Sequence, residues 1–270
     1  MLLTSVILVL REVLEAALLL SILLAMSHYL GLRTRWILMA LAGGILGSIA
    51  YGAGIGIVSQ TFDGMGQELL NAAMQFAIYG LLLLVGILLI WNSAGRQQYL
   101  LLLQWSMVLA VALATLREGS EVYVYLIAFR HQTDLLQSVL LGALIGAGIG
   151  FSIGALFYYL LLGLPRRRRL IFALVLLSLI GAGLCLQAVQ LLEQADWLPA
   201  QAPLWDSSTL LSENSLLGQL LYALLGYEAT PTLMAVIAYI LGLSLMTALL
   251  GWAWIKSRAV PYEYAQGLSE

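Results

Sequence analysis

The sequence predicts an all-α polytopic membrane protein, a single transmembrane domain over residues 1–270 with seven membrane-spanning helices. The first observation is composition. Of the 270 residues, 62% are hydrophobic and only 10% are charged, whereas soluble domains are about half apolar and about one quarter charged. The second is a series of seven apolar runs, each close to the roughly 20 residues that cross a bilayer. The third is a separation of basic from acidic connections between these runs.

Apolar runs bounded by polar residues define the seven spans. We expect them at residues 2–27, 36–58, 69–91, 100–129, 135–163, 170–193 and 231–255. The first run is too long, and too charged in its middle, for a cleaved signal peptide. The long connection 194–230 contains the apolar stretch 216–225, which is too short to span and is expected as an interfacial or re-entrant helix. Thr230 and Pro231 are expected to begin the last span, as its N-cap and first helical residue.

The loop charges predict an orientation, because connections rich in Lys and Arg stay in the cytoplasm. The basic positions lie in alternate connections and in the tail: Arg33, Arg35, Arg96, Arg166, Arg167, Arg168, Arg169, Lys256 and Arg258. The remaining connections are acidic, and Arg130 is their only strong base: Asp63, Glu68, Asp134, Glu193, Asp196, Asp206, Glu213 and Glu228. We therefore expect a multi-pass protein of the cell membrane with its N-terminus outside and its C-terminus inside.

Two spans carry charges at their centres, where each charge costs about 2.5–3.5 kcal/mol. Six charged residues lie there in two Arg-Glu-x-x-Glu motifs: Arg11, Glu12 and Glu15 in the first span, and Arg117, Glu118 and Glu121 in the fourth. Residues three or four positions apart share a helix face, so the glutamates of each motif stack and the arginine reaches the second one. A buried Arg–Glu pair explains one glutamate in each motif. The two surplus glutamates indicate a site for a cation.

The motifs lie 106 positions apart, from Arg11 to Arg117, a separation of three spans. An odd number of spans inverts the second copy, so spans 1–3 and 4–6 are expected to form an inverted repeat, followed by the seventh span. Transporters built this way hold their substrate near the membrane midplane. Glycines, which let helices approach closely, crowd the second span of each half: Gly43, Gly44, Gly47, Gly52, Gly54 and Gly56, and Gly142, Gly146, Gly148, Gly150 and Gly154.

Packing the two halves face to face would bring the four glutamates together. Carboxylate oxygens suit hard cations such as ferric iron, magnesium, manganese or calcium. One cysteine and two histidines do not supply a disulfide framework, a soft-metal site or paired haem ligands. The spans show no serine–histidine, paired-aspartate or paired-histidine constellation, so we expect no enzyme. The sequence also lacks the motifs of nucleic-acid and nucleotide binding.

The two motifs resemble those of the high-affinity iron permease family, which includes bacterial EfeU-type permeases and the fungal permeases partnered with a multicopper ferroxidase. That family carries two such REXXE motifs, typically REGLE, in the first and fourth of seven spans. Here they read REVLE at 11–15 and REGSE at 117–121, and the GYEATPT stretch at 226–232 is also similar. The departures from the common form are Val13 and Ser120.

The resemblance implies import of iron as a transported substrate, without a resident cofactor. It implies that Glu12, Glu15, Glu118 and Glu121 are the metal ligands, supported by Arg11 and Arg117. It also implies an external partner, a ferroxidase or a periplasmic iron-handling protein. Two other functions stay open: import of another hard divalent cation such as manganese, and a non-transporting membrane sensor or scaffold with structural Arg–Glu pairs.

Polar residues near the outer ends of the third and sixth spans are candidates for an outer vestibule. They are Asp63, Glu68, Asn71, Gln75, Gln187, Gln190 and Glu193. Hydrogen bonding between helices is the alternative explanation for these side chains.

Overall fold

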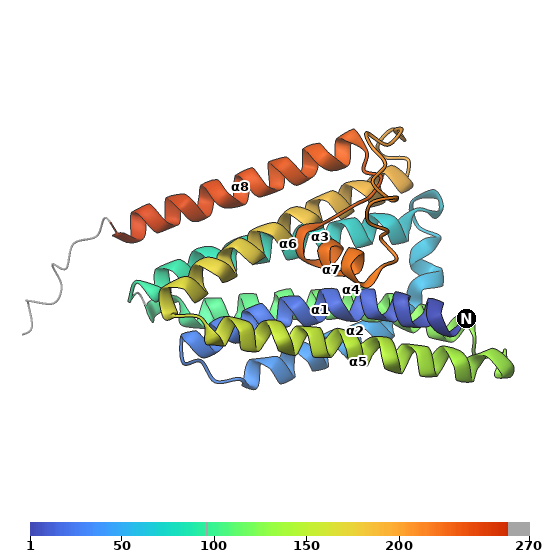
Figure 1. Cartoon of the computed structure of the whole chain (residues 1–270), viewed down its shortest axis with the longest axis horizontal. Helices are drawn as coiled ribbons and strands as arrows, with labels where there is room; N and C mark the ends of the chain where they lie inside the picture. Colours follow the sequence, from blue (N-terminus) through green and yellow to red (C-terminus); the bar gives the residue numbers. More distant parts are fainter. Residues whose placement is uncertain (96, 259–270) are drawn as a thin grey trace, which may run out of the picture.

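The computed structural model describes residues 1–95 and 97–258, and all of the regular secondary structure in these ranges is helical. The long helices are α1 (Leu2–Tyr29), α2 (Arg35–Ser59), α3 (Gly66–Ser93), α4 (Leu100–Ala128), α5 (Thr133–Gly163), α6 (Arg166–Gln194) and α8 (Leu233–Arg258). They run side by side along one long axis (Figure 1). The ten-residue helix α7 (Leu216–Leu225) follows α6 in the chain and packs against α6 and α1. The short 3-10 helices η1 (Phe62–Gly64) and η2 (Gln97–Tyr99) precede α3 and α4.

Six of the helices are long and apolar enough to cross a membrane: α2, α3, α4, α5, α6 and α8. The chain is therefore a multi-pass membrane protein. α1 is not among these six. It has a comparable 28 residues, but Arg11, Glu12 and Glu15 interrupt its apolar run. The helix ends lie close to the expected ones, and the largest difference is the start of α6, expected at residue 170 and observed at Arg166.

The expected start of the last span at Thr230 and Pro231 is wrong, because α8 begins at Leu233. The Thr232 hydroxyl accepts a hydrogen bond from the backbone N–H of Ala235, 3.2 Å away. This is the bond of an N-cap side chain to the third residue of the helix. The Pro231 carbonyl instead accepts a hydrogen bond from the backbone N–H of Leu204 in the preceding connection. The N-cap of α8 is therefore Thr232, the second threonine of the TPT sequence.

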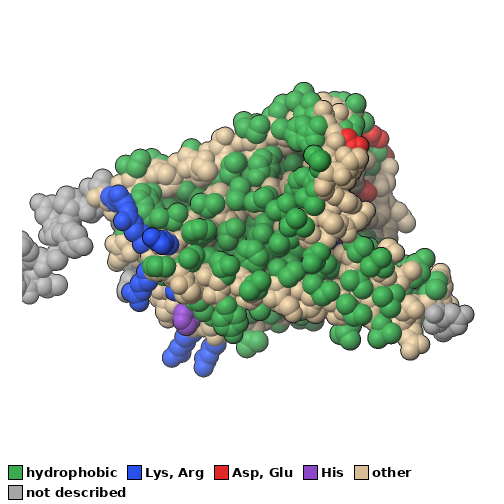
Figure 2. Space-filling model, in the orientation of Figure 1, with side chains coloured by type: hydrophobic (Ala, Val, Ile, Leu, Met, Phe, Trp, Pro, Cys, Tyr) green, Lys and Arg blue, Asp and Glu red, His purple; other side chains and the backbone are tan. Residues whose placement is uncertain are grey.

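Basic and acidic residues gather at opposite ends of the bundle, as Figure 2 shows for one face. We define the basic end by Arg33, Arg35, Arg166, Arg167, Arg168, Arg169, Lys256 and Arg258, and the acidic end by Asp63, Glu68, Glu193, Asp206, Glu213 and Glu228. Arg96, expected among the basic positions, lies outside the described residues, as does the side chain of Asp134. The segregation agrees with the charge pattern of the sequence, and which end faces the cytoplasm stays a prediction.

The helices pair in a crossed pattern. α1 packs along α5, α2 packs along α4, and α3 packs against α6. The first helix of each group of three therefore lies against the second helix of the other group. Glycines permit this approach at particular positions, since a Cβ on Gly146 would lie 2.5 Å from the Val6 carbonyl oxygen of α1. Not every glycine has this role, because Cβ atoms on Gly43, Gly54, Gly56 and Gly148 would meet nothing within 4 Å.

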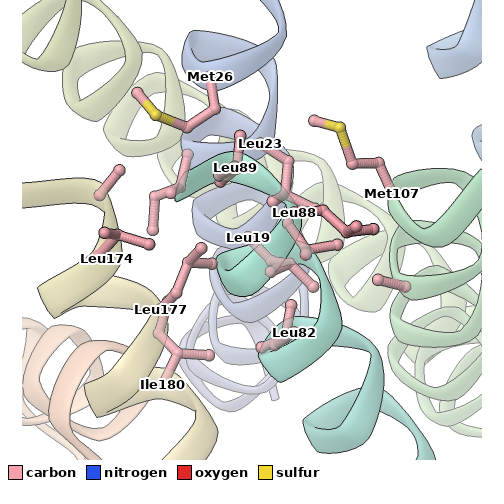
Figure 3. Close-up of a cluster of buried hydrophobic side chains, with 14 of the residues drawn as sticks. Leu19, Leu23, Met26, Leu82, Leu88, Leu89, Met107, Leu174, Leu177 and Ile180 are labelled. Carbon is pink, nitrogen blue, oxygen red and sulfur yellow. The ribbon is translucent and has the colours of Figure 1, made fainter. Parts of the chain in front are cut away.

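A layer of buried apolar side chains fills the half of the bundle toward the basic end (Figure 3). The residues labelled in the figure come from α1, α3, α4 and α6: Leu19, Leu23, Met26, Leu82, Leu88, Leu89, Met107, Leu174, Leu177 and Ile180. In each of these helices the layer lies between the basic end and the polar residues at mid-span. The layer therefore separates those polar residues from the basic end.

Candidate functional site

Helices α1 and α4 pack against each other and bring the two charged motifs together. Carboxylate oxygens of Glu12, Glu118 and Glu121 all lie within 4.8 Å of one another. Glu12 and Glu118 are buried, and Glu121 is partly exposed. This carboxylate cluster, defined by the three glutamates, draws on both motifs, so neither helix would form it alone. The expected fourth member, Glu15, does not belong to the group.

In each motif, the residue that follows the first glutamate packs on a neighbouring helix. Val13 of the first motif packs on Gly150 of α5, where an added Cβ would lie 2.9 Å from the Val13 side chain. Gly119 of the second motif packs on Ser48 of α2, where an added Cβ would lie 3.0 Å from the Ser48 side chain. In the first motif the larger residue, Val13, is in the motif and the glycine is in the neighbouring helix. In the second motif the glycine, Gly119, is in the motif and the larger residue is in the neighbouring helix.

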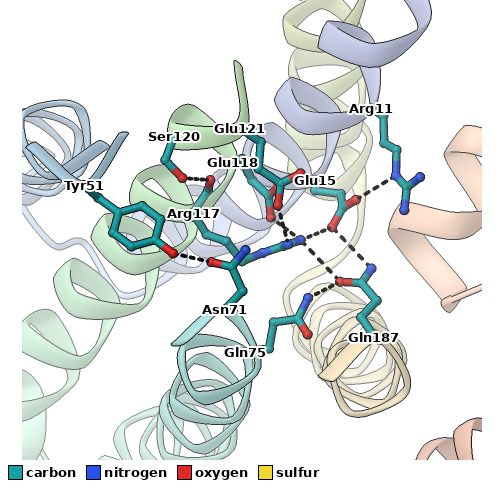
Figure 4. A network of polar contacts seen from close by, with 10 residues as sticks. All are labelled: Arg11, Glu15, Tyr51, Asn71, Gln75, Arg117, Glu118, Ser120, Glu121 and Gln187. Atoms are coloured by element: carbon teal, nitrogen blue, oxygen red, sulfur yellow. Dashed lines mark hydrogen bonds and ion pairs between the residues drawn. The ribbon is translucent and has the colours of Figure 1, made fainter. Parts of the chain in front are cut away.

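Arg117 is the cation at the centre of the site (Figure 4). Its Nη2 lies 2.7 Å from Glu118 Oε1 and 3.3 Å from Glu15 Oε2, and its Nη1 lies 3.2 Å from Glu121 Oε1. It therefore pairs with both glutamates of its own motif and with one of the other motif. The sequence analysis expected each arginine to serve its own motif, but Arg117 connects the two.

Two glutamines extend this network to α3 and α6. Gln75 Nε2 donates to Gln187 Oε1 at 2.7 Å, and the same oxygen accepts from Arg117 Nη2 at 3.3 Å. Gln187 Nε2 donates to Glu15 Oε2 at 3.4 Å. Gln75 and Gln187 were expected in an outer vestibule, and the structure places them in direct contact with the motif network instead.

Arg11 occupies a different environment from Arg117. Its Nε lies 3.7 Å from Glu15 Oε1, and its side chain is 39% exposed, against 7% for Arg117. Figure 4 shows the two guanidinium groups on opposite sides of Glu15. The Arg11 guanidinium carbon also lies 3.9 Å from the centre of the Tyr222 ring in α7, a cation–π distance. The two motifs are thus alike in sequence and unlike in their contacts.

Several buried oxygen atoms of the site have no hydrogen-bond partner: Glu15 Oε1, Glu118 Oε2 and Gln75 Oε1. A buried acceptor without a donor is costly, so it needs an explanation such as a bound ion or water. These two carboxylates and one amide offer hard oxygen ligands, which fit iron, manganese or magnesium and do not favour a soft metal.

Cavities connect this site to the acidic end. A site cavity of about 160 Å³ is lined by Arg11, Glu12, Glu15, Gln75, Arg117, Glu121, Gln187, Gln190, Leu191, Gln194 and Tyr222. Two further cavities share residues with it toward the acidic end, one of about 360 Å³ between α2, α3 and α4 and one of about 420 Å³ beside α7. On the basic side of Glu118, the adjoining cavity of about 20 Å³ has room for about one water molecule. The described cavities around the motifs therefore open toward the acidic end.

The candidate vestibule residues divide between these cavities. Glu68 and Asn71 line the 360 Å³ cavity together with Glu121. Gln190 and Glu193 line the 420 Å³ cavity, where Glu193 accepts a hydrogen bond from the Thr232 hydroxyl at 2.9 Å. Asp63, in the exposed turn η1, is not among the residues that line these cavities.

Sequence reasoning missed three residues at the site. Tyr51 lines the 360 Å³ cavity and donates a hydrogen bond to Asn71 Oδ1 at 3.1 Å. Gln194 lines the cavities of about 160, 360 and 420 Å³, and Tyr222 lines the first and the last of these and contacts Arg11. Tyr222 had one signal, as the single aromatic residue of the short helix LLGQLLYALL. Tyr51 and Gln194 had no such sequence signal, because they are far from the motifs along the chain and no pattern relates them to the motifs.

The connection between α6 and α8 holds a carboxyl group with a shifted pKa. Burial raises the pKa of Glu228, and the nearby Glu213 carboxylate raises it further, while a hydrogen bond from Gln190 acts in the opposite direction. All three of these residues line the 420 Å³ cavity. Asp206, in the same connection and fully exposed, has a lowered pKa because Ser208 donates hydrogen bonds to it.

Comparison with known proteins identifies the family. The Iron permease FTR1 family matches residues 2–258 of the chain. A "Ferrous iron permease EfeU" from Escherichia coli O6:H1 is 28% identical over 244 residues, covering 83% of this chain and 86% of the relative. A protein of the same name from Yersinia pestis is 28% identical over 148 residues, covering 54% and 50%. No solved structure gives a significant match. With nearly its whole length matched, this chain belongs to the Iron permease FTR1 family.

Proposed function

We propose that the protein is an iron permease, in which iron passes from the acidic end to the basic end through the carboxylate cluster of Glu12, Glu118 and Glu121. One observation carries the proposal: three carboxylates from two helices lie within 4.8 Å of one another among membrane-spanning helices. Ionisable groups at this depth usually mark an ion path. The names of the EfeU relatives support iron, in the ferrous state, as the cargo.

Arg117 serves in this proposal as a resident cation that iron partly displaces. In the present arrangement its single positive charge is shared between Glu15, Glu118 and Glu121. An arriving metal ion would compete for the same carboxylates, and Glu15 would become available as a fourth ligand once its contact with Arg117 is broken. Without iron, Arg117 would thereby supply part of the counter-charge that the buried carboxylates need.

The 360 Å³ cavity is the route that best suits a cation. Its charged lining residues are Glu68 and Glu121, and none of the described residues that line it is basic. The 420 Å³ cavity also has acidic residues, but Arg11 lies between it and the site cavity. A cation approaching through the first cavity meets only attractive charges, and Glu121 would be the first ligand of the cluster that it reaches.

We further propose that the acidic end faces outward, that α1 completes a set of seven spans, and that α1–α3 and α4–α6 form an inverted repeat. The positive-inside rule supports the orientation. The crossed packing of α1 on α5 and of α2 on α4 supports the repeat, because a two-fold exchange of the two halves converts one pair into the other. The apolar layer on the basic side and the cavities on the acidic side then describe a state that is open to the outside.

Uptake of radioactive iron into proteoliposomes tests the proposal. We expect wild-type protein to accumulate Fe²⁺ kept reduced by ascorbate, and Glu118→Gln and Glu121→Gln to lose at least nine tenths of the rate. Asp206→Asn is the matched control, since it also removes one carboxylate, in an exposed connection away from the site. Glutamine variants that insert normally and transport like wild type would contradict the carboxylate cluster as the transport site. Wild-type protein that inserts normally and takes up no iron would favour a scaffold. Competition by excess Mn²⁺ distinguishes iron transport from manganese transport.

A further inference from the structure

Arg11 pairs with the motif glutamates more weakly than its position in the sequence would suggest. Arg11 is adjacent in sequence to Glu12 and one helical turn from Glu15, so carboxylates attract it from two sides. Its single ion pair is nevertheless long, at 3.7 Å, and its side chain is far more exposed than that of Arg117. Some other contact must compete for this guanidinium.

The competing contact is the ring of Tyr222. The Arg11 guanidinium carbon lies 3.9 Å from the centre of that ring, and the tyrosine is buried. Cation–π contacts are strongest where water is excluded from the pair. Both side chains line the site cavity and the 420 Å³ cavity, so the pair lies at the boundary between the two.

Helix α7 holds Tyr222 in a fixed place. The hydroxyl of Ser215 caps its first turn by accepting from the Gly218 N–H at 3.0 Å. At its other end Gly226 adopts a left-handed conformation, with φ 67°, against Gly183 of α6. Between the two ends, Ala223 and Leu224 pack in a cluster with Leu14 and Leu18 of α1.

That last contact fixes α7 to the same helix that carries Arg11. Leu14 and Leu18 follow Arg11 along α1 by one and two turns. The ring of Tyr222 therefore keeps its position relative to Arg11 as long as α7 remains packed on α1.

We infer that Tyr222 is a positioning residue for iron binding, which holds the Arg11 guanidinium away from the carboxylate cluster. The inference rests on the proposed function. With the ring in place, Arg117 is the only guanidinium that pairs with Glu118 and Glu121 among the described residues. Without it, Arg11 would turn toward Glu12 and Glu15 and add a second resident cation, which iron would then have to displace.

The test compares two substitutions of Tyr222 in the proteoliposome assay, measured over a range of Fe²⁺ concentrations. Tyr222→Phe keeps the ring, and we expect its KM for iron to stay within about twofold of wild type. Tyr222→Leu removes the ring, and we expect its KM to rise by about fivefold, the size of a cation–π contact whose cation is partly exposed. Tyr222→Met, which also fills the space without a ring, replaces the leucine variant if that variant does not fold.

A background without the arginine separates positioning from a merely structural role. In Arg11→Gln protein, the further change Tyr222→Leu should alter KM by less than twofold, since no guanidinium remains to be held. An equal effect of Tyr222→Leu in both backgrounds would overturn the inference, as would a leucine variant with wild-type KM. Absence of iron uptake by wild-type protein would instead overturn the proposed function, and this inference with it.

Discussion

At the level of single residues, Arg117 forms more ion pairs with the motif carboxylates than any other side chain described. It lies within 3.3 Å of carboxylate oxygens of Glu15, Glu118 and Glu121. Removing one partner from a buried ion network leaves uncompensated charge and costs about 3–5 kcal/mol. We therefore expect Arg117→Gln to lower the free energy of unfolding by about this amount in metal-free detergent solution.

Iron should partly reverse that loss, because a metal ion supplies the missing positive charge. The measurement is thermal unfolding of wild type and Arg117→Gln with and without Fe²⁺. We expect the added iron to raise the Tm of the variant more than that of wild type. An equal rise in both proteins would show that Arg117 and iron do not compete for the same carboxylates.

Glu228 gives a pH-dependent prediction outside the spans. Its folded-state pKa is raised by burial above the unfolded value of about 4.3, so the folded state binds the proton more tightly. Its contribution to stability is then present below about pH 4 and is lost as pH rises through the folded pKa. We expect Glu228→Gln to gain in Tm relative to wild type as pH rises from about 4 to 7, measured in detergent. A difference that stays constant over this range would contradict the shift.

The sequence singled out the six charged motif residues as a candidate cation site, because charges within apolar spans are costly and usually functional. It did not predict that Arg117 would bind across to Glu15, nor that Arg11 would lie against Tyr222. Helical periodicity relates residues within one helix. It carries no information about which of the two motif arginines turns inward. Only Arg11 has the ring of Tyr222 in α7 beside it, and this contact is invisible in the sequence.

At the scale of elements, glycines set the spacing of α5 on α1. A Cβ on Gly146 would lie 2.5 Å from the Val6 carbonyl oxygen and 2.9 Å from the Leu10 backbone nitrogen. Backbone atoms of a helix cannot move aside easily, so Gly146→Ala should separate the two helices and destabilise the protein by about 1–3 kcal/mol.

Gly148→Ala is the matched control, since a Cβ there meets nothing within 4 Å. It should leave the Tm unchanged or raise it slightly, because alanine favours helices. Thermal unfolding in detergent and iron uptake together check both variants. A Tm for Gly146→Ala equal to that of Gly148→Ala would show that the close approach of α5 to α1 is not required.

The elements themselves were largely predictable, since runs of about 20 apolar residues leave few alternatives to a spanning helix. The start of the last span was not. Both Thr230 and Thr232 are N-cap residues by type, and only the contacts of Thr232 with Ala235 and Glu193 decide between them. The crossed pairing of α1 with α5 was also beyond the sequence, where glycine-rich spans indicate close packing without naming the partner.

At the scale of the whole molecule, the arrangement of cavities and apolar layer predicts access from one side only. Gln194 lines the three larger cavities at the acidic end, and Arg167 is exposed at the basic end. In a variant with Cys185 replaced by alanine, a membrane-impermeant maleimide applied outside cells should label Gln194→Cys and leave Arg167→Cys unlabelled. The reverse result would contradict the proposed orientation.

A buried position in the apolar layer is the control for labelling beyond the site. Leu19, 3% exposed, belongs to the apolar layer, and Leu19→Cys should resist the reagent from both sides. Labelling of Leu19→Cys from the outside as fast as Gln194→Cys would show that the layer does not close the path toward the basic end.

The proposed transport path depends on iron binding between the carboxylates of Glu12, Glu118 and Glu121. The most direct measurement is an anomalous difference map at the iron absorption edge, from crystals of the wild-type protein grown with iron. We expect a peak among these three carboxylates, within about 2–2.5 Å of their nearest oxygen atoms. Stoichiometric iron with its only peak in the acidic connections, and none at the cluster, would contradict it.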